Sequence, residues 1–159
     1  MRFFSIIAVT FFLVCLAVPA LSADGNQIRL GAGVGLPYGG RGLNAEYRIN
    51  NYASVGAGLG YFRYDGPGWA LGAAFYPLKN VNTFNPRLSS YYGRVGTLSW
   101  SDGRKEYYLG GTFGGGFEWR VLKNLSLDFD ISYVVKDLPA GVKNNNDNVL
   151  LSTGIGIMF

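Results

Sequence analysis

Acidic side chains that could act together lie in the second half of the chain. Asp128 and Asp130 are two residues apart, so in a strand both point to the same side. Glu118, in the preceding segment, would face them from a neighbouring strand. Such carboxylates could bind a cation or act as an acid pair, or they could form ion pairs with arginines. We favour ion pairs, because an unpaired charge in a dry interior is costly. The residues predicted to form this internal charge network are Arg29, Glu46, Arg48, Glu118, Arg120, Asp128 and Asp130.

The composition excludes several other kinds of site. Histidine is absent, which removes the imidazole base and the commonest metal ligand. The single cysteine, Cys15, cannot form a disulfide or a zinc cluster within the chain. The glycine runs at 31–35 and 56–60 lack the G-x-G-x-x-G spacing of a dinucleotide loop, and the basic residues form no continuous patch for nucleic acid. We therefore expect no enzyme activity, and no catalytic, cofactor-binding or metal-binding residue.

Residues 1–23 have the pattern of a secretory signal peptide. Met1-Arg2 gives a positive start, residues 3–18 are almost wholly apolar, and small residues follow up to Ala23. The alternative is a transmembrane anchor, but the apolar run is shorter than the ~20 residues that a spanning helix needs. The predicted division is a signal peptide at 1–23 and one domain at 24–159, with Cys15 removed on cleavage.

Apolar and polar residues alternate with a period of two along the rest of the chain. This period predicts strands with one apolar and one polar face. In 27–36 the apolar phase runs from Ile28 to Leu36. The alternating segments are 27–36, 43–49, 53–64, 69–77, 87–100, 107–121, 125–135 and 149–159. Turn-forming residues separate them, at 37–42, 50–51, 65–68, 79–86, 101–103, 123–124 and 136–148. The sequence thus predicts an all-β, eight-stranded antiparallel up-and-down barrel.

Segment 87–100 is the irregular one. Its outward set could be Ser89, Tyr91 and Val95, or instead Leu88, Tyr92 and Leu98. We expect a bulge or register shift there.

Either face of such a barrel could be the outer one. A soluble lipocalin-like barrel has an apolar interior, and a transmembrane barrel has an apolar exterior. Here the polar face is mostly glycine, serine and balanced charge, which suits a narrow lumen. Aromatic residues on the apolar face gather near strand ends, as in interfacial girdles. The predicted girdle residues are Tyr61, Trp69, Tyr107 and Tyr133 at one rim, and Tyr47, Phe75, Phe117 and Trp119 at the other. We favour the transmembrane barrel.

The signal peptide, the alternating segments and the closing run Ile155 to Phe159 resemble the small outer-membrane β-barrels of Gram-negative bacteria, the OmpA-like and opacity-protein group. The resemblance implies an outer-membrane location, surrounded by outer-membrane lipid and lipopolysaccharide. It also implies that the barrel-assembly machinery reads a signal in the last strand, at Ile155, Ile157 and Phe159. Segment 79–86 would be a periplasmic turn, and it is long for one.

The predicted function is a structural or surface-interaction role, with the lumen filled by side chains. The alternative is a narrow pore for small solutes or ions. A lipid-modifying enzyme is disfavoured, because the enzymes of such barrels depend on a histidine. With periplasmic termini, the connections expected to face outward are Pro37–Gly42, Asp65–Gly68, Ser101–Glu106 and Lys136–Asn148. The last is the longest and most polar, and polar loops on a rigid scaffold are common binding elements.

Overall fold

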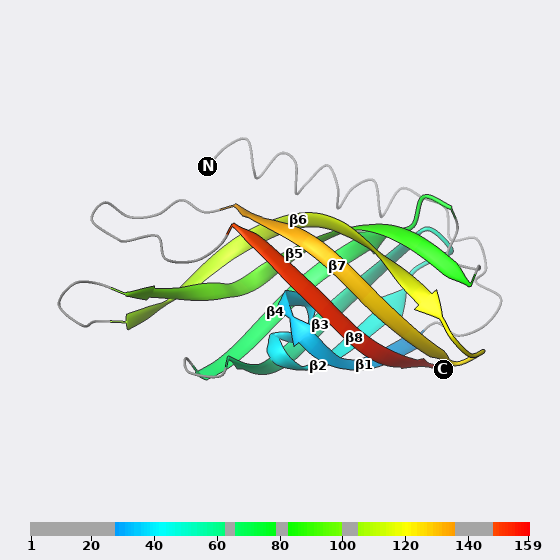
Figure 1. The fold of residues 1–159 in the computed structure, drawn as a ribbon, viewed down its shortest axis with the longest axis horizontal. Coiled ribbons are helices and arrows are strands. Elements are labelled where there is room, and N and C mark those ends of the chain that lie inside the picture. The colour runs from blue at the N-terminus through cyan, green and yellow to red at the C-terminus, as the bar shows by residue number, and fades with distance from the viewer. Residues whose placement is uncertain (1–27, 63–65, 79–82, 100–104, 136–147) are drawn as a thin grey trace.

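The described residues form a closed antiparallel barrel of eight strands (Figure 1). A computed structural model describes residues 28–62, 66–78, 83–99, 105–135 and 148–159. Each strand pairs with its neighbours along the chain, as the alternation predicted. The strands are β1 (Ile28–Gly35), β2 (Gly40–Arg48), β3 (Ala53–Phe62), β4 (Gly66–Phe75), β5 (Phe84–Ser99), β6 (Lys105–Arg120), β7 (Leu125–Val135) and β8 (Val149–Met158), with a short 3-10 helix, η1 (Leu36–Tyr38), after β1.

The first and last strands close the barrel. The β1–β8 register runs from Arg29 opposite Met158 to Val34 opposite Thr153. At the extreme end, the backbone N–H of Phe159 donates to the Ile28 carbonyl at 2.8 Å. Closure leaves the barrel wall without an unpaired strand edge, which is the condition for placing a sheet in lipid.

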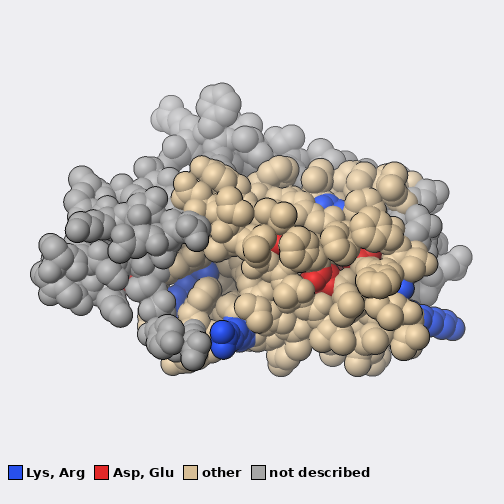
Figure 2. Space-filling view, viewed as in Figure 1, with Lys and Arg blue, Asp and Glu red and all other residues tan. Residues whose placement is uncertain are grey.

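The two faces of the wall differ sharply in polarity. Large apolar side chains are exposed on the outside, with Leu59 70% and Leu43 67% accessible. Charged side chains are buried inside, with Glu118 and Asp130 both 0% accessible. In Figure 2 the face in view is almost wholly uncharged, and charged atoms show only in small patches. This is the reverse of a soluble barrel, and it matches the polar-in, apolar-out alternation of membrane barrels.

The two ends of the barrel are unequal. One end, here called the turn end, carries the C-terminus and the connections 49–52 and 121–124. At the other, the loop end, β5 and β6 project beyond their neighbours (Figure 1). Both strands are 16 residues long, whereas the others have 8 to 11. The β4–β5 pairing ends at Gly93 and the β6–β7 pairing at Gly111, so among the described residues the segments beyond them pair only with each other.

The predicted irregularity in segment 87–100 is confirmed. The register between β5 and β6 shifts between Arg94 and Gly96. Before this bulge, Leu88 and Tyr92 are exposed, whereas Tyr91 is buried. The second of the two alternative facings is therefore correct for the residues whose side chains are described.

The β1–β2 connection corrects the sequence analysis. Leu36 was expected on the outer face, but β1 ends at Gly35 and Leu36 is only 2% exposed. Gly35 has φ of 119°, which favours glycine and turns the chain inward into η1. The connection Pro37–Gly42 does not form an exposed loop, because Pro37 and Tyr38 are buried and β2 already begins at Gly40. The side of the membrane to which it belongs stays a prediction.

Smaller boundary corrections affect the other connections. β5 begins at Phe84 inside the connection expected at 79–86, and Pro86 pairs with Phe117 in the ladder. β4 and β6 also begin within expected connections, at Gly66 and Lys105. Residues 1–27, 63–65, 79–82, 100–104 and 136–147 lie outside the described residues, and so does the predicted signal peptide at 1–23. In the described part of the chain, no helix is long and apolar enough to cross a membrane, a finding that does not address strands.

Candidate functional site in the barrel lumen

A buried ion pair joins the first and seventh strands. The Arg29 guanidinium contacts the Asp128 carboxylate, and its Nε donates to Ser126 Oγ at 2.9 Å. The same carboxylate accepts a hydrogen bond from the Tyr38 hydroxyl at 2.6 Å. Period-two alternation places Ser126 and Asp128 on the inner face of β7. Arg29 reaches them from β1 over the intervening strand β8. Asp128 is therefore held both by the wall and by η1.

Arg87 on β5 is the centre of the charged cluster. Its Nε and Nη2 donate to the two carboxylate oxygens of Asp130, at 3.0 and 2.5 Å, in the two-pronged geometry that guanidinium favours. Its Nη2 lies 3.6 Å from Asp128 Oδ1, and its Nη1 lies 3.8 Å from Glu46 Oε2. The Tyr76 hydroxyl donates to the other oxygen of Glu46 at 2.8 Å. One cation on β5 thus contacts three carboxylates, one on β2 and two on β7.

A third set of charges lies nearer the turn end. Arg48 Nη2 donates to both oxygens of Glu118, at 2.7 and 2.9 Å. Arg120 Nε reaches the same carboxylate at 3.4 Å, and its side chain is partly exposed, at 21%. Glu118 stands directly opposite Asp128 in the β6–β7 register, an arrangement of like charges that repels unless cations lie between them.

These charges form one balanced layer, called the charged layer below. Its members are the cations Arg29, Arg48, Arg87 and Arg120 and the carboxylates Glu46, Glu118, Asp128 and Asp130. Four positive and four negative groups give the layer no net charge. Among the described residues, no group of three or more acidic, cysteine or histidine side chains is placed to hold a metal ion. The arrangement neutralises charge internally rather than presenting charge to a solute.

An apolar cluster, here called the plug layer, lies in the lumen on the loop side. Leu36 of η1 packs there with inward residues from β4, β5 and β7. The fully buried members are Leu36, Ala70, Tyr91, Val95 and Val134, and Tyr108 and Leu150 pack against them. The Pro37 carbonyl accepts a hydrogen bond from Asn44 Nδ2 at 2.9 Å, which fixes η1 to the inner face of β2. The β1–β2 connection therefore folds back into the barrel and packs against its inner wall.

Glycines on β1 and β8 create the space for Tyr38. A Cβ at Gly31 or Gly33 would lie 3.3 or 2.7 Å from the Tyr38 ring, and the atoms nearest to a Cβ at Gly154 all belong to Tyr38. The inward-facing glycines of these two strands thus form a slot that holds the Tyr38 ring. The ring crosses from η1 to Asp128 and links the plug layer to the charged layer.

The structure brings all seven predicted lumen charges together, each in at least one ion pair. Arg87 was not among the predicted residues, because the irregular segment 87–100 obscures its phase, and no partner was predicted for Asp130 by itself. Tyr38 was not predicted either, although a tyrosine between Pro37 and two glycines indicates an unusual turn.

The predicted girdle residues lie on the outer face. Tyr61 and Tyr133 are 57% and 55% exposed near the loop end, and Tyr47 and Trp119 are 48% and 47% exposed near the turn end. Phe117 stacks between its neighbours, with ring centroids 4.9 Å from Phe84 and 5.8 Å from Phe129. Their placement fits interfacial anchors. The predicted set is completed by Trp69, Phe75 and Tyr107, also on the outward phase.

Comparison with solved structures identifies the fold. The chain is similar to the N-terminal β-barrel domain of OprF from Pseudomonas aeruginosa, with a TM-score of 0.61, 15% identity, and coverage of 86% of this chain and 100% of that one. Weaker matches are Neisserial surface protein A (TM-score 0.43, 20% identity, 83% and 95% coverage) and Ail of Yersinia pestis (TM-score 0.37, 17% identity, 83% and 96% coverage). No family profile and no curated protein sequence matches the chain.

The fold class follows from these findings together. The barrel is closed, has eight antiparallel strands, and carries its polar residues inside and its apolar residues outside. The chain therefore has the fold of the small eight-stranded outer-membrane barrels, as its sequence pattern suggested.

Proposed function

We propose that this protein resides in the bacterial outer membrane as a barrel with a closed lumen, and that it acts at the membrane surface through its loop-end elements. The observation that carries the closed lumen is the succession of the charged layer and the plug layer inside the same barrel. Their key side chains are buried: Arg29 is 1% exposed and Tyr38 1%. Such a lumen favours a structural or surface role over a solute pathway.

The projecting β5–β6 ribbon supports a surface role. A strand crosses the hydrocarbon core in about 9–11 residues, so a strand of 16 residues extends well beyond it. Beyond the wall, Gly96 pairs with Tyr108 and Ser99 with Lys105, which keeps the ribbon ordered as a two-stranded unit. A paired ribbon that extends beyond the hydrocarbon core is available for contact with a partner.

Membrane insertion is proposed to use the last strand. Ile155, Ile157 and Phe159 lie on the outward phase of the chain end, at 46%, 48% and 64% exposure. We infer that the assembly machinery reads this apolar pattern. Phe159→Asp should lower the amount of inserted barrel far more than Thr153→Asp, measured by the difference in gel migration before and after boiling. Equal insertion of the two variants would remove the proposed signal.

Conductance in planar bilayers tests the closed lumen. The purified protein, first shown to be folded by its gel migration, should insert without stepwise current. Asp130→Asn is the matched variant, because it keeps the shape of the side chain and removes its charge. Stepwise conductance in the parent whose cation selectivity falls in Asp130→Asn would replace this proposal with a narrow pore lined by the charged layer.

Labelling of intact cells tests the orientation. An epitope inserted at the tip of the ribbon, within 101–103, should be reachable from outside, and so should one within 141–147. An epitope in the turn at 122–124, at the opposite end of the barrel, should be protected until the outer membrane is opened. The reverse pattern would invert the topology and exclude the ribbon as a surface element.

A further inference from the structure

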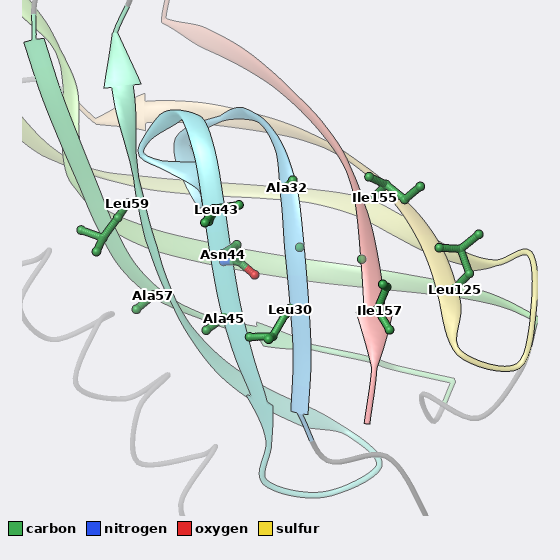
Figure 3. A pocket seen from close by; sticks show the side chains of 12 residues that line it. Leu30, Ala32, Leu43, Asn44, Ala45, Ala57, Leu59, Leu125, Ile155 and Ile157 are labelled. Carbon is green, nitrogen blue, oxygen red and sulfur yellow. The ribbon is translucent and has the colours of Figure 1, made fainter.

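The outer face of the barrel carries an apolar groove across β1, β2 and β3. Its floor consists of three alanines on the outward phase of adjacent strands, Ala32, Ala45 and Ala57. Longer side chains border it, and Figure 3 shows them standing around the alanines. They are Leu30, Leu43, Leu59, Leu125, Ile155 and Ile157. The groove has a volume of about 680 Å³, within the size range of small-molecule sites.

An arginine stands at the loop-side end of this groove. Arg41 lies on the same outward phase of β2 as Leu43 and Ala45, two residues nearer the loop end, or about 7 Å along the strand. It is exposed, and its neighbours across the strands are Val34 on β1 and the girdle residue Tyr61 on β3. Arg41 therefore sits at the level of the aromatic girdle, directly above the groove.

The position of Arg41 differs from that of three other strand arginines. Among the described strands, Arg29, Arg48 and Arg87 point into the lumen and pair with carboxylates. Arg41 faces outward and forms no ion pair with any described acidic residue. A cation on the lipid face is tolerated at the interface and penalised deeper in the bilayer. At the interface it meets lipid headgroups, and guanidinium binds phosphate through two parallel hydrogen bonds.

We propose that Arg41 and the groove bind one lipid with an anionic phosphate headgroup. The phosphate contacts the Arg41 guanidinium beside Tyr61, and an acyl chain lies over Ala32, Ala45 and Ala57 between the bordering leucines. The inference rests on the proposed membrane location and goes beyond it, because it assigns a specific lipid site to one sector of the wall. The small floor residues leave room for an acyl chain, and the cation at the headgroup level fits the phosphate of the same lipid.

Native mass spectrometry of the purified protein, released from detergent micelles, tests the site. The probes are dimyristoyl phosphatidylglycerol and dimyristoyl phosphatidylcholine, which share acyl chains and differ in headgroup charge. The parent should retain one phosphatidylglycerol several-fold more than phosphatidylcholine. Arg41→Gln should lower retention of phosphatidylglycerol to the level of phosphatidylcholine. Ala45→Phe, which fills the floor, should lower retention of both lipids.

Two control variants locate the effect. Lys123→Gln removes an exposed cation from the β6–β7 turn at the opposite end of the barrel, and Leu151→Phe enlarges an exposed outer residue that does not line the groove. Both should retain lipid as the parent does. Gel migration before and after boiling verifies that every variant is folded.

Three results would overturn the proposal. Equal retention of the two lipids, or an unchanged Arg41→Gln variant, would remove the phosphate contact. Loss of lipid in Lys123→Gln alone would move the site to the turn end. A dimer that dissociates in Ala45→Phe, with no retained lipid, would make a second copy the occupant. A barrel that stays soluble without detergent would instead overturn the membrane location itself, so the two failures are distinguishable.

Discussion

The charged layer and the plug layer lie in the same lumen and are built in different ways. In the charged layer, every carboxylate is held by at least one arginine from another strand, as Arg87 on β5 holds Asp130 on β7 over the intervening strand β6. In the plug layer, Leu36 enters from a connection and packs against small and aromatic wall residues. Wall residues supply all the charges of the first layer, whereas the second layer needs a piece of chain folded back into the barrel. Charge pairing therefore ties the strands together, and the plug ties one connection to the wall.

The largest expected effect is in the charged layer. Asp130→Leu leaves the Arg87 guanidinium without its two-pronged partner, and removing one member of a buried pair costs about 3–5 kcal/mol. The free energy of unfolding, measured by tryptophan fluorescence in urea with the barrel in lipid vesicles, should fall by that amount. The double variant Arg87→Met, Asp130→Leu should recover only part of it, because the pair is replaced as a whole but Glu46 loses its cation. No difference between single and double variants would contradict the central role of Arg87.

The charged layer was largely predictable, and the reason is geometric. In a strand, alternate residues share a face, so Asp128 and Asp130 could be placed inside from their spacing alone. Arg87 is the exception. Arg87 lies in the segment with polar residues on both phases, Ser89 and Ser90, and with a bulge at Arg94. A bulge inverts the phase beyond it, so alternation cannot assign facing across it.

The plug layer was not predictable, because the residues that lead into it continue the alternation of the strand before it. Leu36 continues the apolar phase of 28–34, and alternation therefore extended the strand by one residue too many. β1 ends because Gly35 adopts a positive φ. A glycine in the sequence permits that value but does not require it. The slot for Tyr38 depends on glycines from both ends of the chain, Gly33 and Gly154, which only the closed barrel brings together.

The next effect tests the fit of Tyr38 in its slot. Gly154→Ala places a methyl group against the Tyr38 ring, and overpacking a tight site costs about 2 kcal/mol. In a Tyr38→Ala background the same glycine change should cost nothing, since the ring is gone. Urea unfolding of the four proteins of this cycle gives the coupling energy directly. Additive effects would show that the glycine at 154 serves the β-ladder rather than the plug.

A smaller effect is expected from the link between the two layers. Tyr38→Phe keeps the ring and removes the hydroxyl that donates to Asp128 at 2.6 Å. Hydrogen bonds to charged groups contribute about 1.5–3 kcal/mol, and the lower end applies because Arg29 still holds this carboxylate. The free energy of unfolding should therefore fall by about 1.5 kcal/mol, measured in urea as above. In an Arg29→Met background the cost of Tyr38→Phe should change, because the carboxylate has lost its cation. The same cost with and without Arg29 would show that the two layers are independent.

The smallest effect is expected at the rim of the charged layer. Arg120 is the most exposed of its cations, and its Nε lies 3.4 Å from a carboxylate that Arg48 already holds at 2.7 Å. Exposed or partly solvated pairs contribute roughly 0–1 kcal/mol, because water screens the charge and replaces the lost partner. Arg120→Gln should therefore change the free energy of unfolding by less than about 1 kcal/mol, whereas Arg48→Gln leaves Glu118 buried without its closest cation and should cost several-fold more. A large loss of unfolding free energy in Arg120→Gln would mean that the charged layer acts as one cooperative network up to the rim. The contribution of each ion pair would then not depend on its burial.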